Sequence, residues 1–127
     1  MCLEITKNPA KSNRVEVYKV VQQKGRRYYT PYQARPIKEG LFKSNRTSAE
    51  ISQEEIENGA IELGVHVYTR LDLAMTESLC FHYKTMYFLP LYYFKVFRCT
   101  VDPADHVADS ADGTEAVYTQ IEVKECV

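Results

Sequence analysis

The chain has 127 residues, with 16 basic and 17 acidic side chains and 45% hydrophobic residues. This length predicts a single domain over residues 1–127, and the composition is that of a globular protein, which excludes collagen-like, mucin-like and disordered classes. The longest apolar stretch, Thr85–Phe94, has half the length of a membrane-spanning helix and contains Pro90. The N-terminus has no signal-peptide pattern, so we expect a cytoplasmic protein with no membrane partner.

The net charge of −1 hides an uneven distribution of charge along the chain. Residues 1–46 contain 11 basic and 3 acidic groups, whereas residues 47–127 contain 5 basic and 14 acidic groups. A fold that brings the two halves together would neutralise both. A fold that separates them would produce two docking surfaces of opposite sign.

The basic half begins with a predicted β-hairpin. Arg14–Gln22 is rich in β-branched residues, which indicates a strand. The turn Gln23–Arg26 contains a glycine and leads into a second, antiparallel strand over Arg27–Thr30. Two prolines then bound a loop, and Ile37–Lys43 is expected to be extended or irregular.

Two helices and a strand are predicted in the middle of the chain. Ser52–Glu55 fits a capping box, and the following Asn58-Gly59 would end this short helix within two turns. The next strand covers Ile61–Tyr68. A second capping box, Thr69–Asp72, begins a longer helix from about Arg70 to Tyr83. One face of this helix is formed by Leu71, Ala74, Met75, Ser78, Leu79 and His82.

The C-terminal part predicts two strands separated by an acidic loop. Leu91–Val101 is apolar on both faces, which is typical of a central strand. Asp102–Gly113 is expected to be a loop, and Glu115–Glu125 alternates like a half-buried strand. The order of elements indicates an α+β fold: a mainly antiparallel sheet of about five strands with one long and one short helix.

Cysteine and histidine residues are too scattered to predict a metal site. The four cysteines form no C-x-x-C pair, and no motif for a bound cofactor is present. We expect reduced thiols, with Cys80 and Cys99 in the core. A contact between Cys2 and Cys126 is left open.

Cationic and aromatic residues alternate between Lys24 and Lys43. Cations bind phosphates, and aromatic rings stack on bases. Neighbouring strand residues point to opposite faces, so only one of Tyr28 and Tyr29 can stack on a ligand and the other belongs to the core. The segment predicts a site for an acidic protein surface, a nucleotide or another small anionic ligand, with nucleic acid as an alternative. A solvated hairpin paired with the acidic half is the plainer interpretation. The expected contacts are Arg26, Arg27, Tyr29, Tyr32, Arg35 and His66.

Three further features allow both a functional and a structural interpretation. His66 lies mid-strand, where it is either a ligand or acid–base group or a structural histidine bonded across the sheet. The acidic segment Asp102–Glu115 is either a docking surface for a basic partner or a solvated loop. The tyrosine-rich residues 83–94 are either core or the face of a homo-oligomer.

Short motifs over most of the chain resemble a known family. They are Met1-Cys2-Leu3, Val17–Val21, Tyr29–Gln33, Gly64–Thr69 and Leu71–Ala74. In these the chain resembles a family of small uncharacterised proteins from bacteriophages and their bacterial hosts. The resemblance implies an accessory viral protein in the host cytoplasm. Such a protein would act as an anti-defence inhibitor by binding a host protein or by sequestering a nucleotide signal.

A second resemblance is to ADP-ribosyltransferase-like folds. Val17-Tyr18-Lys19 falls at the first motif of those folds, Gly64–Thr69 at the second, and Glu115 at the third. Lys19 stands where those enzymes have histidine or arginine. This resemblance implies an NAD-using enzyme whose candidate catalytic residues are Tyr18, His66 and Glu115. It is the alternative to a binding protein without catalysis.

Overall fold

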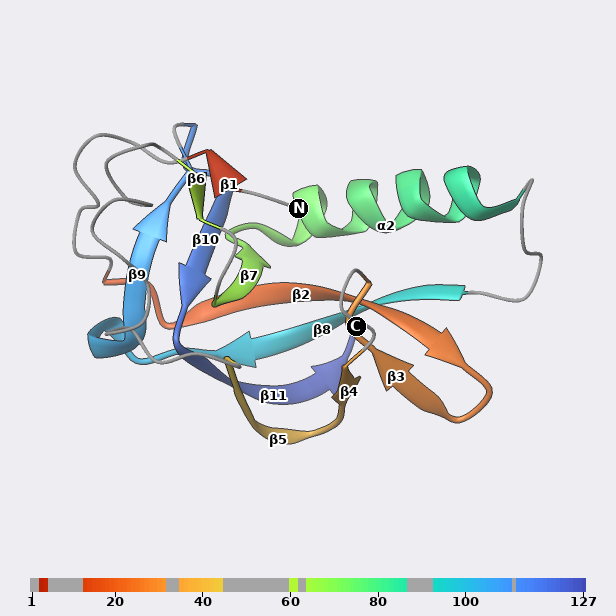
Figure 1. Ribbon diagram of the computed structural model, residues 1–127, viewed down its shortest axis with the longest axis horizontal. Coiled ribbons are helices and arrows are strands. Elements are labelled where there is room, and N and C mark those ends of the chain that lie inside the picture. Colours follow the sequence, from red (N-terminus) through yellow and green to blue (C-terminus); the bar gives the residue numbers. More distant parts are fainter. Residues whose placement is uncertain are drawn as a thin grey trace.

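The computed structural model describes residues 3–4, 13–31, 35–44, 60–61, 64–86, 93–110 and 112–127, drawn in colour in Figure 1. For residues 3–4, 60–61 and 81–86 the description covers the backbone. The helical elements are the α-helix α2 (Leu71–Met86) and the short 3-10 helix η2 (Pro103–Asp105). The strands are β1 (Leu3–Glu4), β2 (Glu16–Lys24), β3 (Arg27–Tyr29), β4 (Pro36–Ile37), β5 (Gly40–Lys43), β6 (Ala60–Ile61), β7 (Val65–Tyr68), β8 (Tyr93–Thr100), β9 (His106–Asp109), β10 (Glu115–Tyr118) and β11 (Gln120–Cys126).

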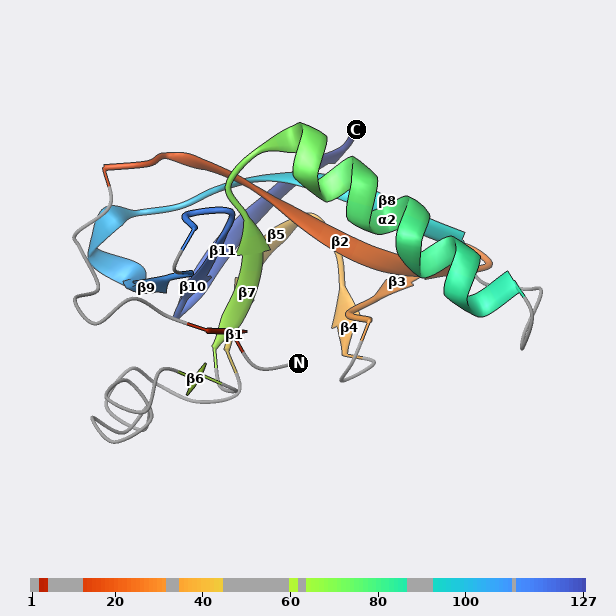
Figure 2. The same ribbon diagram turned by 90° about the horizontal axis from the view of Figure 1, so that it is seen from above.

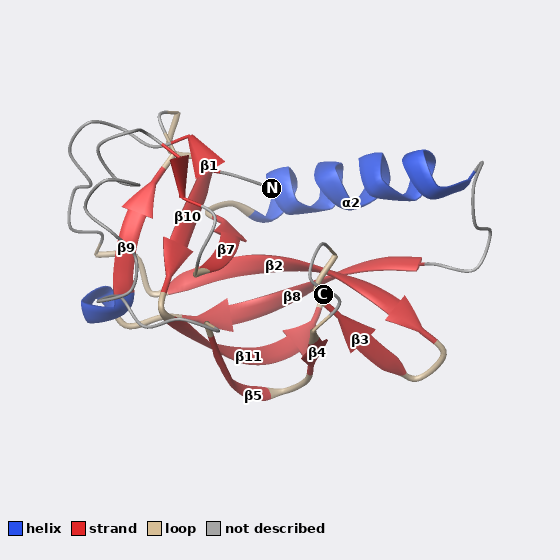
Figure 3. Ribbon diagram, in the orientation of Figure 1, coloured by secondary structure: helices blue, strands red, loops and turns tan. Residues whose placement is uncertain are grey.

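One nine-stranded sheet dominates the molecule (Figure 3). Seven strands follow the order β5-β11-β8-β2-β7-β10-β9, while β3 pairs with β2 and β4. Strands β1 and β6 form a separate pair, and every pairing is antiparallel. The sheet is strongly twisted, and α2 lies across one of its faces (Figure 2).

The predicted α+β fold with about five strands is therefore wrong. The described part of the chain is nearly all antiparallel sheet, with nine strands in the main sheet and α2 as its one α-helix. The missed strands are short: β4 and β5 lie in residues 36–43, expected to be loop or irregular, and the expected loop 102–113 contains β9 after η2. The single strand expected over Glu115–Glu125 is two strands, β10 and β11. The short helix expected after Ser52 lies outside the described residues.

Several local predictions are confirmed. Strands β2 and β3 form the predicted hairpin, and their turn contains Gly25 at φ 61°, a conformation that favours glycine. Strand β8 lies between β11 and β2, so it is central, as its two apolar faces indicate. Helix α2 begins at Leu71 and ends at Met86, close to the expected limits.

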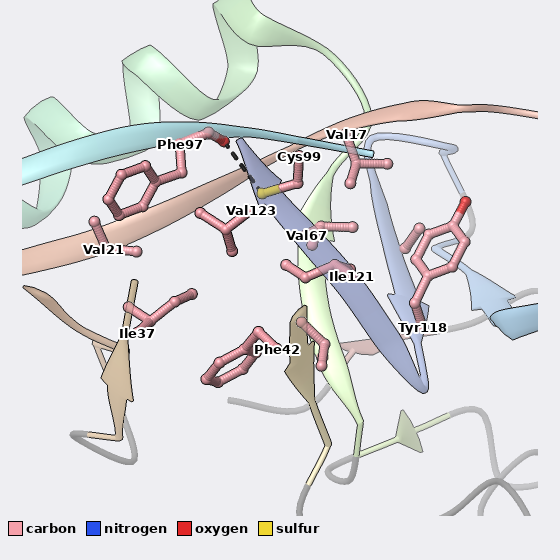
Figure 4. Close-up of a cluster of buried hydrophobic side chains, with 12 residues drawn as sticks. Val17, Val21, Ile37, Phe42, Val67, Phe97, Cys99, Tyr118, Ile121 and Val123 are labelled. Carbon is pink, nitrogen blue, oxygen red and sulfur yellow. Dashed lines mark hydrogen bonds between the residues drawn. The ribbon is translucent and has the colours of Figure 1, made fainter. Parts of the chain in front are cut away.

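The main core lies on the sheet face opposite α2. Alternate residues of the central strands point into it, as the labelled side chains in Figure 4 show. Its larger fully buried members are Val17, Val21, Val67, Cys99, Tyr118, Ile121 and Val123. A smaller cluster under α2 contains Val20, Val96 and Ala74.

Helix α2 buries only the small residues of the face that its sequence predicts. Ala74 and Ser78 are buried against the sheet, whereas Leu71, Met75 and Leu79 are 37%, 44% and 60% exposed. The sheet beneath α2 presents large aromatic side chains from β2, β7 and β8, so small helix residues allow the close approach. The same packing leaves Cys80 exposed, so its predicted place in the core is wrong, while Cys99 is buried as predicted. Cys2 lies outside the described residues.

The tip of the basic hairpin lies apart from the acidic elements η2 and β9 (Figure 1), although strands of the two halves of the chain alternate in the sheet, where β2 pairs with β7 and β8 and β5 pairs with β11. The turn between β2 and β3 is at one end of the longest axis, and η2 and β9 are at the other (Figures 1 and 2). Arg14, which precedes β2, is an exception, because it forms an ion pair with Asp109 of β9.

In the described segments no helix is both long enough and apolar enough to cross a membrane.

Candidate functional site

The tip of the β2–β3 hairpin presents exposed cations. Lys24, Arg26 and Arg27 are all exposed, and the ammonium of Lys24 lies 5.5 Å from the centre of the Tyr29 ring. This distance permits a cation–π interaction. No hydrogen bond or ion pair ties the side chain of Arg26 or Arg27 to another residue of the described segments. Both guanidinium groups are therefore available to an anionic partner.

The two tyrosines of β3 have different surroundings, as the strand alternation predicts. The Tyr28 ring packs edge-on against Phe97, with 4.8 Å between ring centres, and is partly buried against the main core. Tyr29 points to the opposite face, beside Lys24. Of the two, Tyr29 is thus the one that a partner at the hairpin tip can contact.

The remaining predicted contacts do not gather at the hairpin tip. Arg35 donates from Nη2 to the backbone O of Lys43 at 2.8 Å, and its guanidinium lies 4.5 Å from the Phe42 ring centre. Arg35 is therefore committed to the protein's own structure. His66 lies on β7, and Tyr32 lies outside the described residues. Of the predicted contacts, only Arg26, Arg27 and Tyr29 lie together on the β2–β3 hairpin.

Strand β7 diverges from β2 next to His66, and the side chain of Lys19 lies between the two strands at this point. The two strands pair only at Tyr18 and Tyr68, and β2 pairs with β3 only from Gln22 onward. In the gap the Lys19 ammonium donates to the backbone O of His66 at 2.8 Å. Burial lowers the pKa of Lys19 to about 8. The sequence assigned no such role to Lys19, because the contact depends on strands 47 residues apart.

A polar row crosses the sheet on the face that α2 partly covers. Register aligns Glu115, Tyr68, Tyr18 and Arg98 on four successive strands. Tyr68 hydrogen-bonds to Glu115; burial nevertheless raises the pKa of that carboxyl above its ordinary value. Burial likewise raises the pKa of Tyr18. Arg98 at the end of the row is held between the carboxylates of two glutamates, Glu16 at 3.1 Å and Glu125 at 2.7 Å.

Two of the three candidate catalytic residues therefore lie in the same row, two strands apart. Tyr18 and Glu115 flank Tyr68 in the row, and His66 is two residues before Tyr68 on the same strand, opposite Val117. Within the described residues, no group of three histidine, cysteine, aspartate or glutamate side chains is arranged to hold a metal ion. No family model, curated protein or solved structure matches this chain.

Proposed function

We propose that the chain is a small binding protein that acts stoichiometrically, by docking the tip of its β2–β3 hairpin on an acidic surface of a partner protein. The observation that carries this proposal is the pair Arg26 and Arg27. Both are exposed, neither is neutralised by a described residue, and the β2–β3 turn lies at the end of the molecule remote from η2 and β9 (Figure 1). Arginines of this kind form bidentate bonds with carboxylates.

The charge distribution favours a protein partner over a nucleic acid or a nucleotide. A nucleic acid is negatively charged along its whole length, so it would repel the acidic end of a molecule whose net charge is −1. A nucleotide needs groups on several sides to bury it, whereas the hairpin tip presents its cations from one direction. A local acidic patch on a protein meets neither difficulty.

The resemblance to small phage proteins supports a biological setting for this binding. In that setting the partner is a host protein in the bacterial cytoplasm, and occupation of its acidic surface inhibits it. A chain of this size blocks a surface by occupying it, so inhibition requires one copy per site and no turnover.

A charge-reversal pair tests the hairpin directly. The variant R26E/R27E is compared with K43E/K124E, which reverses two exposed lysines away from the hairpin tip and changes the net charge equally. A fluorescent decaglutamate peptide serves as the probe for an acidic protein surface, at about 50 mM salt because screening is weak there. We expect R26E/R27E to bind it roughly tenfold more weakly than wild type, and the control to bind like wild type.

Three outcomes would contradict this proposal. Equal losses in both variants would assign binding to net charge and not to the hairpin. Tighter binding of wild type to a single-stranded RNA or to a cyclic dinucleotide than to the peptide would replace the partner class. Binding that does not weaken as salt rises would show that charge is not the recognised feature.

A second candidate function is an NAD-using enzyme of the ADP-ribosyltransferase kind. The observation that favours it is the alignment of Tyr18 and Glu115 on either side of Tyr68, with a carboxyl whose pKa is raised by burial. Carboxyl groups with raised pKa values occur often in catalytic sites.

This candidate expects nicotinamide release from NAD by wild type and its loss in Glu115→Gln. The matched control is Glu122→Gln, which removes an exposed carboxylate of β11 outside the row. Nicotinamide is measured by chromatography after incubation with NAD alone and with bacterial lysate. Wild type that releases no nicotinamide above the background rate in either condition removes the enzyme from consideration.

A further inference from the structure

A groove of about 240 Å³ lies near the acidic end of the molecule, between the start of β11, β5 and the segment after β8. We call it the acidic groove. Its apolar lining comes from Leu41, Val101 and Ile121, and its carboxylates come from Asp102, Asp105 and Glu122. Leu41 is 60% exposed, so an apolar surface lies directly beside the carboxylates.

Each of the three carboxylates has a hydrogen-bond or ion-pair partner, and only one of these partners is a cation. Asp102 Oδ1 accepts from the backbone N of Ala104 at 2.9 Å, and Asp105 Oδ2 accepts from Gln120 at 3.1 Å. Neither donor carries a charge, and no described cation pairs with either aspartate. Glu122 alone has a cationic neighbour, Lys124 at 2.7 Å. The groove therefore retains a negative charge that favours a cationic occupant.

The shape and chemistry of the groove suit an arginine side chain better than a metal ion. A metal needs oxygens that converge on one point, and the described carboxylates offer no such cluster of three. An arginine side chain has an apolar stem that packs on aliphatic groups and a planar head that bonds carboxylates. The exposed side chain of Leu41 and the carboxylates of Asp102 and Asp105 match these two parts.

We infer that the acidic groove receives Arg26 or Arg27 from the hairpin of a second copy, so that the chains associate head to tail. This rests on the hairpin as the docking element of the proposed function. The hairpin tip and the segment 102–105 lie at opposite ends of the longest axis, so a chain does not fill its own groove (Figures 1 and 2). Two different surfaces meet in such a contact, and the association is open-ended unless it closes into a ring.

The functional consequence is competition for one hairpin. The acidic surface of the partner protein and the acidic groove of another copy both require Arg26 and Arg27. Self-association therefore covers the hairpin until a better acidic surface displaces the groove. We expect the decaglutamate peptide to dissociate the oligomers.

Two variants and their mixture test the head-to-tail contact. The hairpin variant R26E/R27E keeps the groove, and the groove variant D102N/D105N/E122Q keeps the hairpin. In sedimentation velocity at about 50 mM salt, we expect the mean mass of wild type to rise above the 14.7 kDa of one chain as concentration increases. Each variant alone stays at the mass of one chain. An equimolar mixture forms dimers and nothing larger, because each pair uses the one intact hairpin and the one intact groove.

Several results would overturn the inference. They are wild type that stays at the mass of one chain, a groove variant that associates like wild type, and a mixture that forms no dimer although both variants show native circular dichroism. The proposed function is tested separately, because the groove variant should bind decaglutamate at least as tightly as wild type, its hairpin being uncovered. If wild type associates and the groove variant does not, while both bind the peptide, both proposals are supported. If wild type itself does not associate but still binds the peptide, the head-to-tail contact alone is overturned.

Discussion

Replacing Asp109 with asparagine is expected to lower the free energy of unfolding by about 2 kcal/mol, because it breaks a half-buried network that joins the two halves of the chain. Both oxygens of Asp109 accept from the guanidinium of Arg14, each at 3.1 Å, and Oδ1 also lies 2.9 Å from Nε2 of His106. Arg14 further donates to the hydroxyl of the buried Tyr118 at 2.9 Å. Asparagine keeps the size but loses the charge, and leaves the Arg14 cation partly buried.

The measurement is urea unfolding at neutral pH, with Asp72→Asn as the matched control. Asp72 also pairs with an arginine, Arg70, but these two side chains are 63% and 67% exposed, against 23% and 22% for Asp109 and Arg14. Exposed pairs contribute little, so the control should lose less than about 0.5 kcal/mol. Equal losses in the two variants would show that the Asp109 network contributes no more than a surface pair.

The pH dependence of this difference has a defined sign. Burial by itself would raise the pKa of Asp109, but the bonds from Arg14 and His106 outweigh it and hold the pKa below its ordinary value. The stabilisation is therefore present above the ordinary aspartate pKa of about 3.9 and is lost as pH falls through the lower folded value. The gap between wild type and Asp109→Asn should stay constant from neutral pH to about pH 5 and close below about pH 4.

The second large effect is expected at Lys19, whose replacement by methionine should raise the free energy of unfolding at pH 7 by about 1–2 kcal/mol. Burial lowers the pKa of Lys19 from 10.5 to about 8, so at pH 7 the folded protein holds an ammonium that is poorly solvated. Methionine removes that cost. The variant also loses the bond to the carbonyl of His66, which offsets part of the gain.

Wild type should accordingly become more stable as pH rises from about 8 to about 10.5, because over this interval the unfolded state binds more protons than the folded state. The rise is at most about 3 kcal/mol, since water screens the part of Lys19 at the surface. Urea unfolding of Lys19→Met over the same range should lack this rise, and the exposed-lysine control Lys38→Met should keep it. A rise that survives in Lys19→Met would assign it to another group.

The interactions of Asp109 and of Lys19 each connect different strands of the sheet, and neither involves the hairpin tip. The Arg14–Asp109 pair ties the start of β2 to the acidic end, whereas Lys19 bridges β2 and β7 where these strands diverge. Neither uses Arg26 or Arg27. The described contacts therefore stabilise the sheet without occupying the hairpin cations that the proposed function requires.

Local signals in the sequence were sufficient for the elements whose causes are local. The β2–β3 hairpin follows from β-branched residues around a glycine turn, and α2 follows from its periodic apolar residues, although the hydroxyl of Thr69 bonds to Gly113 and Thr114 and forms no capping box. The alternation along β3 predicted that only one of Tyr28 and Tyr29 faces a ligand, and the structure assigns Tyr28 to the core side. These features involve residues close together in the chain, so composition and spacing were enough to predict them.

The tertiary structure decided whatever depends on distant partners. Strands β4, β5 and β9 are two to four residues long, and they become strands only because β3, β11 and β10 supply hydrogen bonds to them. The sheet also decided which side of α2 is buried.

The same distinction between local and distant causes applies to the candidate site. The sequence by itself determined that a basic hairpin and an acidic segment exist. It added Arg35 to the hairpin contacts because Arg35 is cationic and close in sequence, and His66 because a mid-strand histidine can contact a ligand. Only the tertiary structure turned Arg35 toward Phe42, aligned Tyr18 with Glu115, and placed the two charged segments at opposite ends. Pairing between strands tens of residues apart sets these positions, and that pairing depends on the packing of the whole sheet.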